Sequence, residues 1–102
     1  MNETNNSDEW THFENLNGKY KVEYIGDEGV RNIYEGDWKN NKKHGKGKLV
    51  LEEDEFYEGD FKYDKFDGKG KYVSPNYFRY EGDFKNNEYH GKGKLHILTV
   101  IS

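Results

Sequence analysis

The chain repeats one pattern three times at a spacing of 23 residues, and this repetition constrains its fold more than any other feature. YEGDWKNNKKHGKGKLV starts at Tyr34, YEGDFKYDKFDGKGKYV starts at Tyr57, and YEGDFKNNEYHGKGKLHI starts at Tyr80. Repetition at a fixed period of this size is typical of arrays in which each unit is a small supersecondary piece that packs on its neighbours. The sequence therefore predicts a repeat array.

Each unit has the alternating polarity of a β-hairpin. Tyr34, Gly36 and Trp38 alternate with charged residues, and after a polar segment the glycines of GKGKLV alternate with lysines. Alternation with a period of two indicates strands, and the polar segment between them indicates a turn. We expect hairpin turns at residues 40–44, 52–55, 63–67, 74–78 and 86–90.

Residue size and charge together predict how these strands are paired. Pairing Tyr34 with Leu49 collects the aromatic residues and glycines on one face of the sheet. The same register places Trp38 opposite Gly45, which we interpret as an empty site beside a large ring. On the other face, Glu and Asp then lie opposite Lys, both within a hairpin and across the junction to the next one. A slip of one residue would lose both matches.

The predicted fold is all-β: an elongated single antiparallel meander of repeated hairpins with about seven strands. A degenerate half repeat precedes the three full units, because Val22 can be placed opposite Tyr34 with the charge pairing preserved. Upstream of it we expect a disordered or short capping segment, with a first hairpin strand as the alternative. The predicted segments are 1–17 (capping or disordered), 18–33 (half repeat), and the repeats 34–56, 57–79 and 80–102.

Composition excludes several classes of function. The chain has no Cys, so disulfides and thiolate chemistry are excluded. Its formal net charge is −4 and its lysines are interspersed with acidic residues, so no basic block suggests nucleic-acid binding. No segment has the length of a transmembrane span, and the first 18 residues are too polar and acidic for a targeting peptide. We therefore expect a cytoplasmic protein.

The three units resemble MORN repeats, whose family pattern reads approximately YxGxWxxGxxHGxG. The residues that match it are Tyr34, Gly36, Trp38, His44, Gly45 and Gly47, then Tyr57, Gly59, Phe61, Gly68 and Gly70, then Tyr80, Gly82, Phe84, His90, Gly91 and Gly93. The usual turn glycine is replaced by Asn41, Asp64 and Asn87, residue types that tolerate positive φ. The resemblance implies a β-hairpin scaffold associated with proteins, the cytoskeleton or membranes.

Nothing in the sequence indicates catalysis. The carboxylates recur every 23 residues opposite lysines, which is a pairing pattern and lacks the singularity of an active site. His12, His44, His90 and His96 follow no metal-ligand spacing. GKGK lacks the pattern of a phosphate-binding loop. We expect no enzyme activity, no cofactor and no metal.

The aromatic face is the predicted binding surface for a protein partner. Aromatic residues offer large contact areas at low entropic cost, and MORN arrays, which the units resemble, grip a partner helix or extended peptide or pair with a second array. The apolar C-terminal run is expected to be covered by a second copy or another protein, or to fold back on its own chain. The residues predicted to bind a partner are Tyr34, Trp38, Tyr57, Phe61, Tyr80, Phe84, Leu98, Val100 and Ile101. A face that serves only as the core of the chain is the alternative.

A second class of function is peripheral binding to phospholipid headgroups, which the resemblance also implies. Lys42, Lys43 and His44 form the one local basic cluster in the sequence and are the candidate headgroup site. The equivalent turns of the other repeats do not reinforce it, so this remains the alternative function.

Overall fold

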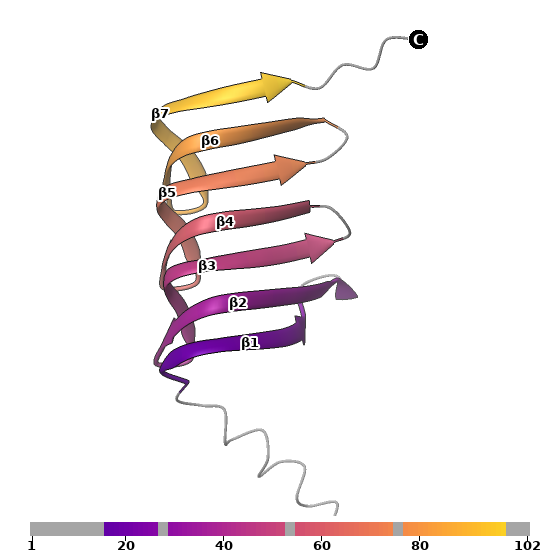
Figure 1. Ribbon diagram of the computed structural model, residues 1–102, viewed down its shortest axis with the longest axis vertical. Helices are drawn as coiled ribbons and strands as arrows, with labels where there is room; N and C mark the ends of the chain where they lie inside the picture. Colours follow the sequence, from indigo (N-terminus) through magenta and orange to yellow (C-terminus); the bar gives the residue numbers. More distant parts are fainter. Residues whose placement is uncertain (1–15, 27–28, 53–54, 75–76, 98–102) are drawn as a thin grey trace, which may run out of the picture.

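The computed structural model describes residues 16–26, 29–52, 55–74 and 77–97. They form one seven-stranded antiparallel sheet in which neighbouring strands follow each other along the chain (Figure 1). The predicted all-β meander is therefore confirmed. Its strands are β1 (Gly18–Ile25), β2 (Arg31–Lys39), β3 (Lys42–Glu52), β4 (Glu55–Lys62), β5 (Lys65–Ser74), β6 (Phe78–Lys85) and β7 (Glu88–Ile97).

The turns within the repeats are shorter than predicted. β2 and β3 are joined by Asn40 and Asn41 alone, both with positive φ (48° and 66°). Residues 63–64 and 86–87 have the same conformation. Two central residues with positive φ define the type I′ turn, whose twist matches that of the flanking strands. The expected five-residue turns at 40–44, 63–67 and 86–90 are wrong, and the turns expected at 52–55 and 74–78 centre on residues outside the described part of the chain.

The short turns are compensated by a bulge in the second strand of every hairpin. Tyr34 faces Leu49 as predicted, but Trp38 faces Lys43 in place of Gly45. Three residues of β3, from 44 to 46, therefore oppose the single residue Asp37. A bulge bends its strand and increases the local twist, and the strands of the repeats curl toward their turns (Figure 1).

The bulge also corrects our interpretation of the first glycine in GKGK. Gly45 has a φ of +103°, a conformation that residues with a side chain rarely adopt. A Cβ at this position would lie 2.7 Å from the carboxylate of Asp37, so the site is not an empty space beside an aromatic ring. Gly45 does lie opposite Phe61 across the junction to the next hairpin, as predicted.

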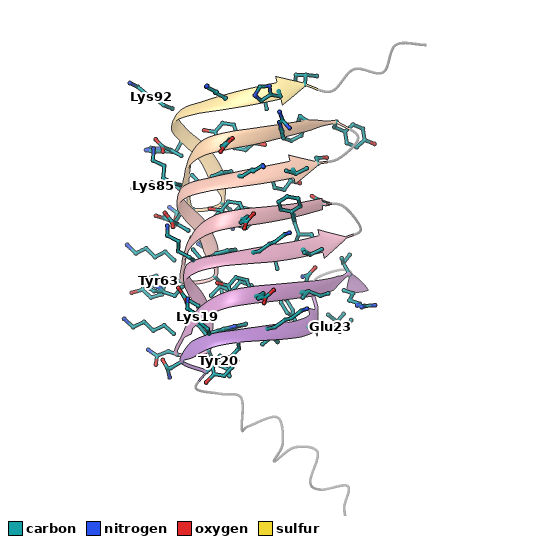
Figure 2. All side chains as sticks on the ribbon, viewed as in Figure 1. Lys19, Tyr20, Glu23, Tyr63, Lys85 and Lys92 are labelled. Carbon is teal, nitrogen blue, oxygen red and sulfur yellow. The ribbon has the colours of Figure 1, made fainter. Side chains whose placement is uncertain are left out.

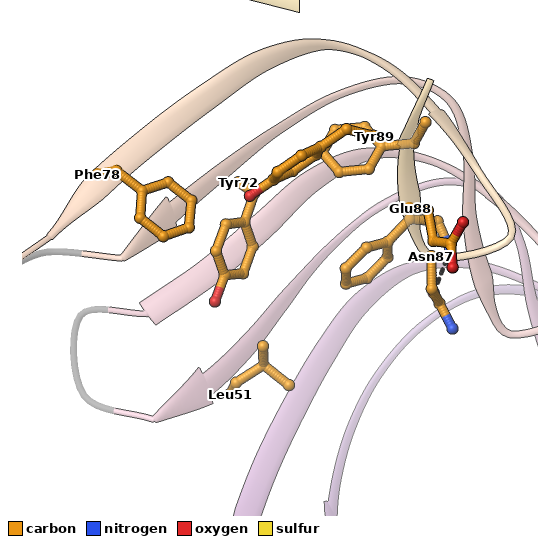
Figure 3. A pocket seen from close by; sticks show the side chains of 8 residues that line it. Leu51, Tyr72, Phe78, Asn87, Glu88 and Tyr89 are labelled. Atoms are coloured by element: carbon orange, nitrogen blue, oxygen red, sulfur yellow. Dashed lines mark hydrogen bonds between the residues drawn. The ribbon is translucent and has the colours of Figure 1, made fainter. Parts of the chain in front are cut away.

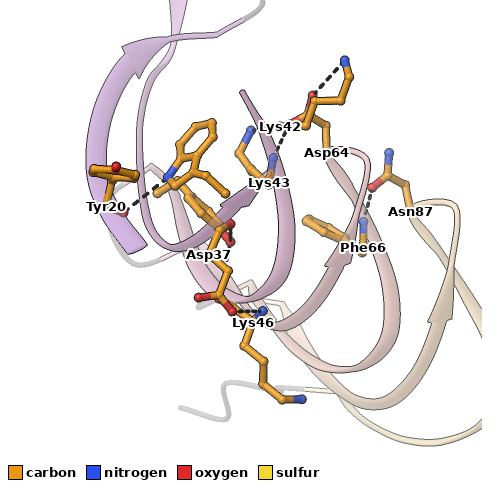
Figure 4. Close-up of polar contacts among 10 residues, drawn as sticks. Tyr20, Asp37, Lys42, Lys43, Lys46, Asp64, Phe66 and Asn87 are labelled. Carbon is orange, nitrogen blue, oxygen red and sulfur yellow. Dashed lines mark hydrogen bonds and ion pairs between the residues drawn. The ribbon is translucent and has the colours of Figure 1, made fainter. Parts of the chain in front are cut away.

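One aspartate in each repeat holds the bulge and joins two hairpins. The Lys46 backbone N–H donates to Asp37 Oδ2 at 3.0 Å, and Lys19 Nζ of the preceding strand lies 2.6 Å from Asp37 Oδ1 (Figure 4). Asp60 and Asp83 repeat this arrangement with the lysines of β3 and β5. The predicted charge pairing is confirmed as contact ion pairs at the three junctions.

The second glycine of GKGK is small because a tyrosine ring lies across it. A Cβ on Gly47 would be 2.2 Å from the hydroxyl oxygen of Tyr34, which donates to the backbone carbonyl of Asp37 at 2.9 Å. Gly70 and Gly93 have the same relation to the tyrosines of their own hairpins. The predicted empty site beside a ring is thus found at this glycine.

The inner side of the bend is the hydrophobic core. The rings of successive repeats meet edge to face, with centroids 5.0 Å apart for Tyr34 and Phe61 and also for Tyr57 and Phe84. Such pairs contribute about 0.5–1.5 kcal/mol each beyond the area that they bury. The buried apolar residues are Tyr34, Leu49, Tyr57, Phe61, Tyr80 and Phe84.

Adjacent turns are joined by a reciprocal pair of hydrogen bonds. The Asp64 backbone N–H donates to the Lys43 carbonyl at 2.9 Å, and the Lys43 N–H donates to Asp64 Oδ1 at 2.8 Å. Asn87 and Phe66 form the same pair, which we call the turn clasp (Figure 4). The turn residue therefore needs both tolerance of positive φ and a side-chain acceptor, which Asn and Asp combine.

The predicted half repeat forms β1. Val22 lies opposite Tyr34 and Gly18 lies opposite Trp38, as expected from the sequence. Leu16 and Asn17 accept hydrogen bonds from the backbone of the first turn. The helical or disordered segment expected upstream falls on residues 1–15, outside the described part of the chain.

We predict that the free energy of unfolding depends on Asp60 far more than on Glu58, its neighbour in the other charge row. Replacing Asp60 with Ala removes an ion pair and the acceptor for the bulge, and should cost about 1–2 kcal/mol in urea denaturation. Asp60→Asn keeps an acceptor oxygen and should cost less. Glu58→Gln should change stability by less than about 0.5 kcal/mol, since Glu58 faces Lys71 without a contact ion pair among the described residues. Equal losses at both positions would contradict this.

The same comparison should depend on pH. Partial burial alone would raise the pKa of Asp60, but the hydrogen bonds from Lys46 and from the Lys69 backbone outweigh it and hold that pKa below its usual range. A depressed carboxyl pKa stabilises the fold above the pKa of the unfolded chain, and this contribution is lost as the pH falls through the folded value. The difference between wild type and Asp60→Asn should therefore shrink as the pH is lowered below about 4.

Candidate functional site

A hollow of about 540 Å³ opens on the inner side of the bend, toward the C-terminal half of the sheet (Figure 3). Its side chains come from four strands and one turn, and most of them are apolar. We call it the aromatic hollow. The residues that line it are Leu51, Phe66, Tyr72, Phe78, Phe84, Asn87, Glu88 and Tyr89.

The floor of the aromatic hollow is held rigidly by the core beneath it. Phe66 stacks on Tyr57 with ring centroids 3.8 Å apart and planes 5° apart. Tyr89 stacks on Tyr80 at 4.2 Å, yet 48% of its surface is exposed. The hollow is therefore preformed, and a ligand would meet rings that are already ordered.

Polar groups lie at the side of the hollow. The Tyr72 hydroxyl donates to Glu55 Oε2. Burial, followed by this hydrogen bond and the charge of Glu55, raises the pKa of Tyr72 well above its usual value. Tyr72 therefore stays a neutral hydrogen-bond donor. Asn87 and Glu88 add an amide and a carboxylate at the turn (Figure 3).

The residues predicted to bind a partner mostly lie beneath this surface. Tyr34 and Tyr57 are 0% exposed, and Phe61, Tyr80 and Phe84 are also buried. The prediction that these five side chains form an open trough is therefore wrong, because they fill the space inside the bend. Phe84 alone also contributes to the hollow.

The remaining predicted residues have different positions. Trp38 is half-buried, and its Nε1 donates to the Tyr20 carbonyl at 3.4 Å. Leu98, Val100 and Ile101 lie outside the described residues, so the prediction that they contact a partner stays untested.

Sequence reasoning missed most of the residues that line the hollow. Phe66 and Tyr89 were assigned to long turns, although each lies two residues after Asp64 or Asn87 and alternates with the strand that follows. Recognising the two-residue turns would have placed both rings on the inner face. Leu51 and Phe78 have no apolar counterpart in every repeat, so the repeat pattern gave no signal for them.

The family model of the MORN repeat matches residues 34–52, 57–79 and 80–97, which together make up more than half of the chain. The chain belongs to the MORN-repeat family. A search of curated proteins finds no match. MORN repeats generally mediate protein or membrane interactions, and this function class applies to the array described here.

In the first MORN repeat, a lysine replaces the ring that stacks on the tyrosine in the other two. Lys43 is 8% exposed, and its Nζ lies 4.7 Å from the centroid of the Tyr24 ring and 5.7 Å from that of Tyr34. Asp64 Oδ1 is 3.6 Å away. Lys43 is thus a paired cation among aromatic rings, inside the bend of the array.

This placement divides the predicted headgroup cluster. Lys43 points into the MORN core, while Lys42 is exposed with its Nζ 4.0 Å from Asp64 (Figure 4). His44 packs near Tyr63, and its Nδ1 is buried without a hydrogen-bond partner among the described residues. The three residues do not form one exposed basic surface, so the predicted cluster is wrong as a unit.

A different basic group forms where the MORN hairpins turn. Lys62 lies directly opposite Lys65, and together with Lys85 of the next repeat they line a hollow of about 250 Å³. Tyr63, Asp67 and Asn86 complete its lining. Lys85 and Tyr63 extend from the bent side of the sheet in Figure 2. The sequence did not indicate this group because the lysines come from different strands.

Two further classes of feature were searched for in the described residues of the MORN array. No three His, Cys, Asp or Glu side chains there are grouped closely enough to hold a metal ion. None of those residues belongs to an apolar helix long enough to cross a membrane.

We predict that replacing Lys43 with Phe stabilises the array. The substitution would extend the stacked rings to the first repeat and remove a charge that is costly to bury, raising the free energy of unfolding by about 0.5–1.5 kcal/mol. The turn clasp would remain, because it uses only the backbone of Lys43. Phe66→Lys, the matched exchange in the second repeat, should lower stability. Destabilisation by Lys43→Phe, measured by urea denaturation, would show that the cation itself holds the fold.

Proposed function

We propose that the chain is a non-catalytic protein-interaction module that binds an apolar helix or extended peptide of a partner in the aromatic hollow. The observation that carries this proposal is the group of partly exposed rings and Leu51 above a rigid aromatic floor. Concave, largely apolar and preformed sites with a few polar groups are the usual form of a binding site. Aromatic side chains in such sites commonly supply most of the binding energy.

The use of the carboxylates supports a non-catalytic role. Asp37, Asp60 and Asp83 each hold a bulge and an ion pair. Glu55 accepts the Tyr72 hydroxyl. These groups have structural partners, and we propose that the array acts by holding other molecules, in the cytoplasm or on structures associated with the cytoskeleton or membranes.

We predict that a charge in the hollow weakens binding of the partner, whereas the same charge on the opposite face does not. Leu51 lines the hollow, and its neighbour Val50 points to the other face of β3. A photo-crosslinking side chain at position 51, but not at position 50, should capture the partner in cells. With the purified partner, Leu51→Asp should raise the Kd at least tenfold, equivalent to about 1.4 kcal/mol.

Val50→Asp is the matched control for that measurement and should leave the Kd within about twofold, a change of roughly 0.4 kcal/mol. Both variants must first give the wild-type circular dichroism spectrum. Capture from position 50 alone, or equal losses of affinity, would mean that the partner binds elsewhere on the sheet.

Membrane binding is the second candidate function, and it is favoured by the lysines at the turns. Like charges directly opposite each other destabilise a sheet, and Lys62 and Lys65 are such a pair, as are Lys39 and Lys42. A headgroup phosphate in the hollow beside Lys85 would relieve this repulsion. The chain then would bind anionic membranes through its bent side.

We predict that the double variant Lys62→Glu, Lys65→Glu reduces recovery of the protein with phosphatidylcholine vesicles containing phosphatidylinositol bisphosphate. The double variant Lys71→Glu, Lys94→Glu carries the same change in net charge on the other side of the sheet and should retain binding. Recovery should fall with added salt, because exposed charges are screened. Equal recovery with vesicles of phosphatidylcholine alone would rule out a headgroup site.

A further inference from the structure

The strands of the array are of two kinds, which alternate. In β2, β4 and β6 the face outside the bend carries Glu and Asp two residues apart, and we call these the acidic strands. In β1, β3, β5 and β7 the same face carries two lysines, and we call these the lysine strands. Because the number of strands is odd, both edges of the described sheet are lysine strands.

Each internal lysine strand is completed by the acidic strand that follows it. Lys46 pairs with Asp60, and Lys69 Nζ lies 2.5 Å from Asp83 Oδ1. The bulge glycine lies opposite an aromatic residue of the acidic strand, as Gly68 does opposite Phe84. The following turn then adds the clasp, in which Asp64 or Asn87 contacts the backbone of the lysine strand.

β7 presents the same groups, and no described residue completes them. Lys92 occupies the position of Lys46 and Lys69, and its side chain extends into solvent (Figure 2). Tyr89 occupies the position of Lys43 and Phe66, and no turn clasp reaches it among the described residues.

The exposure of β7 shows what the missing neighbour would cover. All ten residues of β7 are exposed. Leu95 is 53% exposed, whereas Leu49, its counterpart in the first repeat, is 6% exposed. A sheet edge with unpaired backbone groups and an uncovered apolar row is a template for a further strand.

The charges determine which strand this can be. A second copy of the chain would offer either β7 or β1, and Lys19 and Lys21 of β1 would meet Lys92 and Lys94. Like charges directly opposite each other are unfavourable. An acidic strand would place a carboxylate opposite each lysine, as in every junction of the array.

We propose that the edge of β7 binds an acidic β-strand of another polypeptide. This strand carries Glu and Asp two residues apart, an aromatic residue after the Asp, and an Asn or Asp in the turn that follows. The carboxylates pair with Lys94 and Lys92, the aromatic residue lies opposite Gly91, and the turn residue forms a clasp with Tyr89. This surface is separate from the aromatic hollow, and the proposal does not rest on the function proposed for the hollow.

A peptide with the sequence of residues 78–87, FRYEGDFKNN, is the probe. We expect it to bind the purified chain saturably and to shift the backbone NMR resonances of β7. A peptide with Lys at both acidic positions should bind at least tenfold more weakly. In the chain variant Lys92→Glu, Lys94→Glu this preference should reverse, so that the lysine peptide binds more tightly than the acidic one.

Two controls make the test specific. Lys62→Glu with Lys65→Glu carries the same charge change away from the edge and should bind the acidic peptide as the wild type does. Leu51→Asp should also retain peptide binding, so failure of the hollow as a site would not affect the result. Absence of saturable binding, resonance shifts outside β7, or equal binding of the two peptides would overturn the proposal, as would a wild-type dimer joined through β7.

Discussion

The aspartate that follows Glu-Gly in each repeat is the residue on which the rest of the structure depends. Its carboxylate accepts the backbone N–H of the bulge in its own hairpin and pairs with the lysine of the preceding strand, as Asp37 does with Lys46 and Lys19. Its carbonyl accepts the hydroxyl of the buried tyrosine. One residue thus joins the bend of a strand, the pairing of two hairpins and the position of the main core ring.

Curvature follows from this arrangement, and the binding surfaces follow from curvature. A flat sheet of this size would have two open faces and no core. The bulges curl the strands so that the aromatic residues pack on each other, and the tyrosines can lie close to the backbone because Gly47, Gly70 and Gly93 leave room for them. The curled sheet has a buried inner layer, with the aromatic hollow above part of it.

The fold could be predicted from the sequence because its information is periodic. Three copies of one alternating pattern determine the strands, and the pairing of Tyr34 with Leu49 is supported by both faces at once. The bulge could not be predicted, since the register with it and the register without it differ by two residues and place the same side chains on the same faces. The pairing of Trp38 with Lys43 therefore required the structure.

The candidate site was harder to predict because it lies where the repeats differ. The repeated aromatic residues serve the core, which every repeat must build, and Tyr57 is fully buried for that reason. The hollow is made by residues such as Leu51 and Phe78, which have no apolar equivalents at the same position in the other repeats. A pattern shared by all units describes the scaffold, whereas function is carried by the exceptions.

The odd number of strands gives β1 a role as a polymerisation stop. A sheet that began at β2 would have an acidic edge at one end and a lysine edge at the other, and these edges are complementary. Head-to-tail contacts of that kind do not close on themselves, so they generate filaments. β1 covers the acidic edge with a lysine strand, through Lys19 and Asp37, and so makes the two ends of the array repel each other. Eight residues that look like a degenerate fragment of a repeat thereby keep the molecule finite.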